Sequence, residues 1–261
     1  MIDVDQNVTF EIKVYENDWE YILKGSYLEK IICRCNYTFK RKVLFINNVN
    51  NLEKVKKYAE KKVLKGVIDE YFVVNLYEQE ALSYFNIKKE SFRGGYYYSI
   101  AELVSIYLCE TKYLLHFSSD SFLTKKNMNW IDDAIKIFKE NDDVIVANPT
   151  WNFDYKQAKK ESLFEIDDFY VSYGFSDQCY LIKTNVFKKQ IYSENHIDSL
   201  RYPIYGGELF EKRVDSFMRN NNKLRITSKK VSYIHINFPK CKNWLKKVYF
   251  KFFINKNRLN F

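Results

Sequence analysis

The chain has 261 residues, of which 46% are hydrophobic and 18% aromatic, and it contains only 7 glycines and 3 prolines. This composition supports a sizeable core and excludes a disordered or linker-rich chain. Most of the net charge of +9 comes from the segment between Lys240 and the C-terminus, which carries seven basic residues and no acidic one. A nucleic-acid-binding face spread over the whole fold is therefore not expected.

Cysteine usage and hydropathy indicate the compartment. The five cysteines, Cys33, Cys35, Cys109, Cys179 and Cys241, are scattered and odd in number, so we expect reduced thiols. No signal peptide opens the chain and no run of 18 apolar residues occurs. These features predict a soluble, cytoplasmic protein.

Strands and helices alternate through the first 150 residues. Strands are predicted over residues 8–15, 42–46, 71–76, 113–117 and 143–147, and helices over residues 18–34, 52–65, 78–85, 99–110 and 129–140. The first helix is expected to begin with Asp18 as its N-cap. This alternation is typical of an α/β fold with a mostly parallel central sheet flanked by helices.

The pattern changes after Pro149. Residues 150–170 are polar and aromatic and predict a long loop or irregular helix, whereas residues 175–182 predict a strand. A helix is predicted to follow residues 206–211 and to run through Arg219, and a late strand spans residues 231–236. We expect one domain over residues 1–238, in which residues 1–150 form a nucleotide-binding half and residues 151–238 complete the site.

The strand over residues 113–117 ends abruptly in Ser118, Ser119 and Asp120. Ligands of open α/β sheets bind beyond the carboxyl ends of the strands. A carboxylate there can hold a divalent cation, which in turn holds a diphosphate. The alternative is that Asp120 only caps a turn or the next helix.

The order of these segments resembles the GT-A glycosyltransferases, in particular the bacterial family-2-like enzymes. The resemblance covers most of the chain and rests on residues 10–17, 46–48, 112–121, 206–218 and 231–235. It implies a GT-A, Rossmann-like fold and transfer of a sugar from a nucleotide-sugar donor. The implied donor-binding residues are Tyr15, Glu16, Asn17, Asn47, Asn48, Ser118, Ser119 and Asp120.

The family's Asp-x-Asp motif reads Ser118-Ser119-Asp120 here, so its first carboxylate is missing. The resemblance implies a divalent cation, Mn²⁺ or Mg²⁺, held by Asp120 together with His235 of the late strand. The alternative for His235 is a hydrogen-bonded structural role.

An inverting transfer needs a base that takes the proton of the acceptor hydroxyl. By comparison with the family, Glu211 is nearest to the position of the base, and Glu208, beside two glycines expected to leave space for substrate, is its rival. Asp177 and Gln178 are expected to contact the sugar or the acceptor. Either glutamate is alternatively a capping carboxylate in the first turn of a helix.

The tail, residues 239–261, predicts a basic amphipathic helix. Aromatic and aliphatic side chains recur on one face, with lysines around it, which suits the surface of an anionic membrane. Alternatively, this helix packs on the domain. The resemblance implies a glycan or lipid-linked acceptor in bacterial surface polysaccharide synthesis, at the inner face of the membrane and with no nucleic-acid partner. Two other functions stay open: a nucleotide-sugar-binding protein with weak or no turnover, and a nucleic-acid-binding protein that uses the basic tail.

Overall fold

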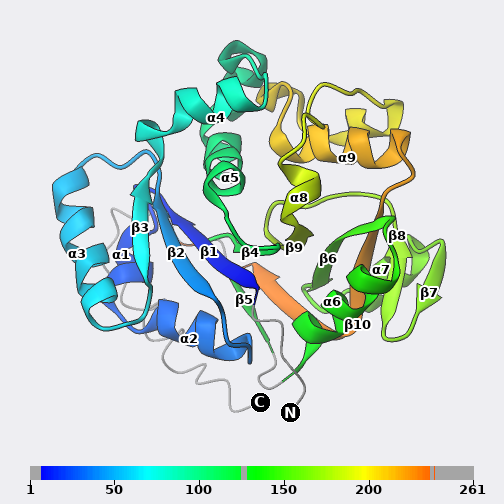
Figure 1. Ribbon diagram of the computed structural model, residues 1–261, viewed down its shortest axis with the longest axis horizontal. Helices are drawn as coiled ribbons and strands as arrows, with labels where there is room; N and C mark the ends of the chain where they lie inside the picture. The colour runs from blue at the N-terminus through cyan, green and yellow to red at the C-terminus, as the bar shows by residue number, and fades with distance from the viewer. Residues whose placement is uncertain (1–6, 125–127, 236–237, 239–261) are drawn as a thin grey trace.

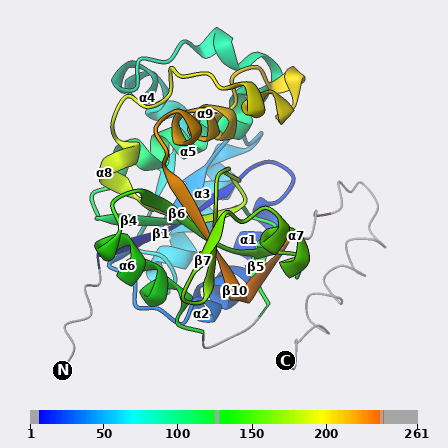
Figure 2. The same ribbon diagram turned by 90° about the vertical axis from the view of Figure 1, so that its right-hand side faces the viewer.

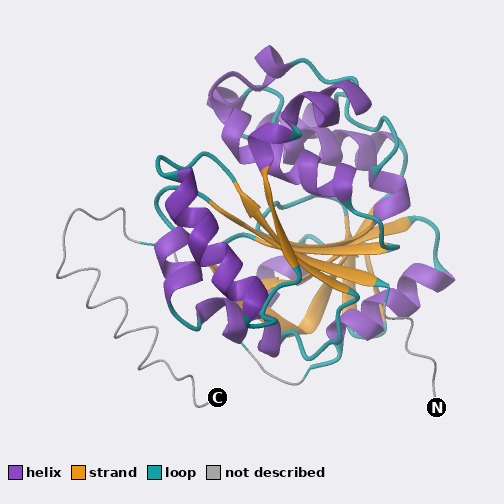
Figure 3. Cartoon of the chain, turned by 60° about the vertical axis from the view of Figure 1, so that its left-hand side comes forward, coloured by secondary structure: helices purple, strands orange, loops and turns teal. Residues whose placement is uncertain are grey.

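A computed structural model describes residues 7–124, 128–235 and 238 of the chain. Its centre is a 10-stranded sheet with the order β3-β2-β1-β4-β9-β6-β10-β8-β7, in which β5 pairs with β10 off the main path. Helices cover both faces of this sheet (Figure 1, Figure 3). The predicted α/β class with a mixed, mostly parallel sheet is confirmed, while the predicted tail helix over residues 239–261 lies outside the described residues.

Four parallel strands form one side of the sheet: β1 (Val8–Val14), β2 (Arg41–Ile46), β3 (Glu70–Val73) and β4 (Tyr113–Phe117). Every residue of β4 is buried, as expected of an apolar strand covered on both faces. Because the strands are parallel and adjacent in the order β3-β2-β1-β4, their carboxyl ends meet at one edge.

The other side of the sheet is mixed. β9 (Cys179–Lys183) lies antiparallel between β4 and β6 (Val144–Trp151), and β10 (Leu224–His235) runs parallel to β6. β10 begins just after α9 and runs through the sheet as one of its strands (Figure 2). The remaining strands are β5 (Ser121–Leu123), β7 (Phe164–Ile166) and β8 (Phe169–Ser172).

Two helical layers enclose the sheet (Figure 1). One layer consists of α1 (Trp19–Lys24), α2 (Tyr27–Arg34), α3 (Leu52–Leu64) and α6 (Trp130–Glu140). The other consists of α4 (Glu78–Tyr84), α5 (Tyr96–Leu108), α8 (Thr184–Phe187) and α9 (Phe210–Asn220). Each layer packs on one face of the sheet and forms its own apolar core. Short 3₁₀ turns span Val74–Leu76 (η1), Lys89–Gly95 (η2), Ile197–Arg201 (η3) and Ile204–Gly206 (η4).

Several predicted boundaries were wrong. The helix predicted over residues 18–34 is divided into α1 and α2, because Gly25 adopts an extended conformation between them. The region predicted as a loop or irregular helix, residues 150–170, contains α7 (Tyr155–Lys160) and most of the β7–β8 hairpin. β10 begins seven residues before the predicted strand, since its first half is rich in lysine, arginine and threonine and lacks an apolar alternation.

The four cysteines within the described ranges are free thiols, and Cys241 lies outside them. Among the described residues, no helix has both the length and the apolar character needed to cross a bilayer.

Gly206 and Gly207 serve close packing, which corrects the expectation that they leave space for substrate. A Cβ atom on Gly206 would lie 2.6 Å from the side chain of Leu209, and one on Gly207 would lie 2.3 Å from the carbonyl oxygen of Ser91. Gly207 also has a φ of +60°, a conformation that L-residues rarely adopt. The segment before α9 is therefore pressed against η2.

We expect Gly207→Ala to lower the free energy of unfolding by more than about 2 kcal/mol, because the strained φ adds to a backbone clash. Gly66→Ala is the matched control, since Gly66 has a φ of +67° with nothing within 4 Å of its Cβ position. It should cost only about 1–2 kcal/mol. Urea denaturation of both variants measures the difference. Equal losses of unfolding free energy in the two variants would show that the backbone at Ser91 moves aside without a measurable energetic cost.

Candidate active site

Asp120 and His235 face each other at the carboxyl end of β4. Asp120 follows β4, and the next residue, Ser121, pairs with His235 in the β5–β10 ladder. This register brings His235 Nε2 to 3.0 Å from Asp120 Oδ2. The hydrogen bond to Asp120 raises the pKa of His235, against the opposing effect of its partial burial. Both side chains remain partly accessible to a ligand.

Of the two serines before Asp120, Ser118 orients its carboxylate. Ser118 Oγ lies 3.2 Å from Asp120 Oδ1 and 2.7 Å from Ser121 Oγ, and the Ser118 amide donates to the carbonyl of Gln178 at 2.8 Å. Ser119 points the other way and donates to Asp18. The contact of Asp120 with Ser118 is the kind expected of a residue that only stabilises a turn. Its contact with His235, a residue far away in the chain, is the kind expected of a ligand site.

Asp18 is a site residue that the sequence did not reveal. Its side chain makes no N-cap hydrogen bond to α1, contrary to prediction. Instead, its carboxyl group reaches back to accept from the amide of Tyr15 at 2.7 Å, as residue N3 does in a capping box, and from Ser119. Asp18 is fully buried, and desolvation raises its pKa to about 8 in spite of these donors.

The predicted residues at the ends of β1 and β2 come together. Glu16 Oε2 accepts from the amide of Asn50 at 2.8 Å, and the Asn47 amide donates to the carbonyl of Val14 at 2.8 Å. Asn47 Nδ2 also donates to the carbonyl of Tyr97 at the start of α5, at 2.9 Å. Much of the hydrogen-bonding capacity of Glu16 and Asn47 is therefore used to join loops.

Tyr15 and Asn17 lie at the same turn. The pKa of Tyr15 is raised, mainly by burial and to a smaller extent by the neighbouring charges of Asp18 and Asp120. A cavity of about 330 Å³ opens beside the ends of β2 and β3. Polar residues in its lining are Asn47, Asn48, Asn75, Glu78 and Lys89, together with Tyr97.

Glu211 and Asp177 are two acidic residues that lie close together. Glu211 lies in the first turn of α9 and accepts a hydrogen bond from the backbone of Asp177. Burial, and then the neighbouring charge of Asp177, raise the pKa of Glu211 to about 8. Both residues line a cavity of about 110 Å³ between α5, α9 and η4, which Tyr98 and Tyr205 also line.

Glu208 occupies a different environment. Its carboxylate pairs with Lys212 one turn later at 2.7 Å, and its backbone amide donates to Ser91 at 2.9 Å. It does not line the cavity that Glu211 and Asp177 share. The geometry thus separates the two glutamates that the sequence left as rivals, and it favours Glu211 as a proton acceptor.

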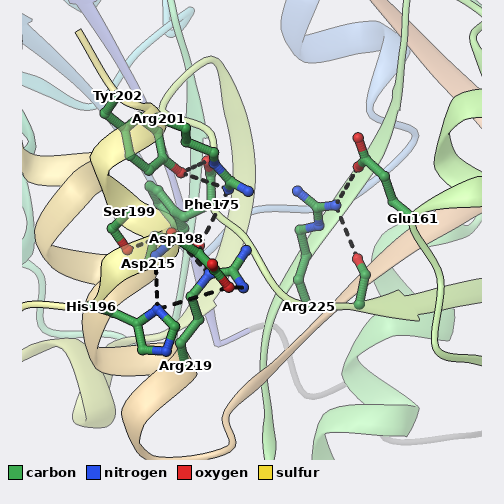
Figure 4. A network of polar contacts seen from close by, with 11 residues as sticks. Glu161, Phe175, His196, Asp198, Ser199, Arg201, Tyr202, Asp215, Arg219 and Arg225 are labelled. Atoms are coloured by element: carbon green, nitrogen blue, oxygen red, sulfur yellow. Dashed lines mark hydrogen bonds and ion pairs between the residues drawn. The ribbon is translucent and has the colours of Figure 1, made fainter.

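A charged network joins α9 to η3 (Figure 4). Asp215 is fully buried and accepts from Ser199 at 2.6 Å, from Arg201 at 3.3 Å and from Arg219 at 3.1 Å. Tyr202 donates to the carbonyl of Phe175 at 2.7 Å. η3 is therefore held on α9 and on the segment before β9, a role for Asp215 that only the tertiary structure reveals.

Among the described residues, no group of three or more histidine, cysteine, aspartate or glutamate side chains could hold a metal ion. Asp120 and His235 nevertheless present one carboxylate and one imidazole to the same point. This donor set fits a divalent cation whose other ligands come from a diphosphate.

No family model and no curated protein sequence matches this chain. Among solved structures, it resembles GalNAc-T7, crystallised with UDP, GalNAc and Mn²⁺, with a TM-score of 0.55 and 13% identity. The match covers 90% of this chain but 45% of GalNAc-T7, so the chain spans less than half of that protein. A second similar structure is glucosyl-3-phosphoglycerate synthase from Mycobacterium tuberculosis, with a TM-score of 0.46, 9% identity, and 93% and 74% of the two chains covered. The predicted GT-A fold is confirmed.

The pKa of Asp18 generates a prediction about stability. Between its ordinary value of 3.8 and about 8, the unfolded chain loses the Asp18 proton while the folded protein keeps it. Stability should therefore fall as the pH rises from about 4 to about 8, and Glu211 acts in the same direction. Asp18→Asn keeps an acceptor for the Tyr15 amide, offers Ser119 Oγ an N–H donor in place of the hydrogen bond that Ser119 donates, and cannot ionise, so it should reduce this fall.

Urea denaturation at pH 5 and pH 8 measures the effect. Asp142→Asn, which changes a fully exposed carboxylate, is the control and should leave the pH dependence as it is. An Asp18→Asn variant with the wild-type pH dependence would show that Asp18 is ionised in the folded protein.

Proposed function

We propose that this protein is a glycosyltransferase that moves a sugar from a nucleotide-sugar donor to an acceptor with inversion. The observation that carries this proposal is a junction at residues 177–178. The carbonyl of Gln178 accepts from Ser118 beside Asp120, and the backbone of Asp177 donates to Glu211. A diphosphate-binding pair and a carboxylate of raised pKa thus adjoin the same two residues of a GT-A fold.

The donor would lie across the ends of β1, β2 and β4. Its nucleoside would occupy the cavity lined by Asn47 and Asn48, and its diphosphate would reach Asp120 and His235. GalNAc-T7 was crystallised with UDP and Mn²⁺, which supports a divalent cation between the diphosphate and these two side chains. When bound, such a cation would neutralise charge on the departing diphosphate.

Glu211 would act as the base. As the acceptor oxygen bonds to the anomeric carbon of the donor sugar, the bond from that carbon to the diphosphate breaks and the diphosphate takes the electron pair. Glu211 takes the proton of the acceptor hydroxyl. A pKa of about 8 makes the carboxylate a stronger base than an exposed glutamate, although less of it is ionised at pH 7.

A protein that binds a nucleotide sugar without turnover is the second candidate. One observation favours it: Ser118 stands where the Asp-x-Asp motif has its first carboxylate, so the motif offers a cation a single carboxylate, Asp120, beside His235. Such a protein would bind UDP but would release no nucleoside diphosphate from UDP-sugars supplied with acceptors.

The acceptor that we propose is a glycan or lipid-linked glycan of bacterial surface polysaccharide, and the site of action is the cytoplasmic face of the membrane. Support for this comes from the sequence of residues 239–261, whose lysines and aromatic residues suit an anionic lipid surface.

Asp120→Asn should weaken the binding of UDP with Mn²⁺ by about tenfold or more, because the amide is a poorer ligand for a hard cation. Isothermal titration calorimetry with UDP, with and without Mn²⁺, measures this. Asp142→Asn is the control variant and should bind as the wild type does. Equal affinity of Asp120→Asn and the wild type would show that Asp120 only stabilises its turn and takes no part in UDP binding.

Glu211→Gln should lower turnover by about 10²–10⁴-fold with little change in UDP affinity, because proton transfer belongs to the transition state. The wild-type rate should rise with pH through about 8, since only ionised Glu211 accepts a proton. The measurement is nucleoside diphosphate release from UDP-sugars with a panel of glycan acceptors, and Glu208→Gln is the matched control. Loss of turnover in Glu208→Gln alone, or a product that retains the anomeric configuration of the donor, would contradict the assignment.

A further inference from the structure

A third cavity, of about 250 Å³, lies against β6, β10 and α7 and plays no part in donor binding as proposed above. Trp151, at the end of β6, forms one of its walls, and its ring is 50% exposed, whereas Trp19 and Trp130 are buried. The polar residues of the lining include Asn148, Gln178, Thr227, Asp154, Glu161 and Arg225.

This cavity adjoins the proposed reaction centre. Gln178 lines it and follows Asp177, the neighbour of Glu211, in the chain. Tyr233 lines it from β10 and donates to Gln178 Oε1 at 3.1 Å, two residues before His235. A group bound here would therefore lie next to the junction at residues 177–178, on the side away from the cavity of Asn47 and Asn48.

The chemistry of the lining suits a sugar. An exposed tryptophan ring offers a flat apolar face to the C–H groups of a pyranose, and amide and hydroxyl groups pair with its hydroxyls. Gln178 Nε2 has no hydrogen-bond acceptor among the described residues, and Asn148 Nδ2 contacts only the carbonyl of Pro149, at 3.3 Å. The volume is below the roughly 300–1,000 Å³ typical of drug-sized ligands, which fits a single sugar unit.

The charged residues of the lining favour a neutral sugar over a sugar acid. Arg225 is held by Ser172 at 3.0 Å and lies 3.6 Å from Glu161 (Figure 4), so its charge already has a partner. Asp154 caps α7 by accepting from the amide of Gln157 at 3.0 Å, and it adds a negative charge that no cation in this lining compensates. A sugar acid would meet this excess of negative charge, whereas a neutral sugar would meet only hydrogen-bonding groups.

We propose that this cavity is the acceptor subsite and that it takes a neutral sugar unit stacked on Trp151. This proposal rests on the function proposed above, since it assigns the partner of the same transfer. Trp151 is a specificity-determining residue in this assignment and takes no part in proton transfer.

Saturation-transfer difference NMR on the full chain tests the proposal. The probes are methyl glucoside, methyl galactoside, methyl N-acetylglucosaminide and methyl glucuronide, with UDP and Mg²⁺ present in the same samples as an independent report of the donor site. We expect saturation of at least one neutral glycoside and none of the glucuronide. Trp151→Ala should weaken binding of that glycoside by at least about fivefold and leave the UDP signal unchanged.

Two variants serve as controls. Trp151→Phe keeps an aromatic face and should retain part of the binding, whereas Phe164→Ala removes an equally exposed aromatic residue of β7 that does not line the cavity, and should change nothing. The proposal is overturned if no neutral glycoside is saturated, if the glucuronide is saturated more strongly, or if Trp151→Ala binds like the wild type. A UDP signal without glycoside binding would overturn this subsite alone, whereas glycoside binding without a UDP signal would refute the donor site and leave the cavity as a sugar-binding site.

Discussion

A buried carboxylate–imidazole contact and an ion pair beneath α5 hold the strand ends in place. Glu11 of β1 contacts His116 of β4, and Lys13 of β1 contacts Glu102 of α5. Glu11, His116 and Glu102 are almost completely buried, and an unpaired ion there would cost several kcal/mol. β1, β4 and α5 are thereby fixed relative to one another, so the turn after β1, the serines after β4 and the start of α5 keep one arrangement.

Lys13 also connects this buried cluster with the carboxylates of the site. Its charge lowers the pKa of both Asp18 and Glu211, yet burial dominates at each and their pKa values remain near 8. A site designed only for stability would have ionised, well-solvated carboxylates. Here two acidic groups within the electrostatic influence of one lysine have pKa values near 8, an arrangement typical of acid–base chemistry and costly to stability.

The parts of the molecule that could be predicted from sequence are those set by local pattern. Apolar strands such as Tyr113–Phe117 and the polar residues that follow them are contiguous, so the sequence predicts their edge of the sheet. The burial of Asp18, the separation of Glu208 from Glu211 and the anchoring role of Asp215 depend on contacts with residues far away in the chain. The β7–β8 hairpin was missed because its strands have only three and four residues, too few to show a clear alternation, and β7 exposes an aromatic and an acidic residue.

The loss of the first carboxylate of the Asp-x-Asp motif is consistent with these surroundings. The charge of Asp120 already contributes to the raised pKa of the buried Asp18. A third carboxylate at position 118 would add like charge beside a buried acid. Ser118 instead lies within hydrogen-bonding distance of Asp120 and Ser121, so it orients the remaining carboxylate toward His235 without adding charge. In the proposed function, the imidazole would supply a nitrogen ligand in place of the missing carboxylate, and it comes from β10, the strand from which Arg225, Thr227 and Tyr233 line the proposed acceptor cavity. The proposed donor and acceptor sites would thus share one strand.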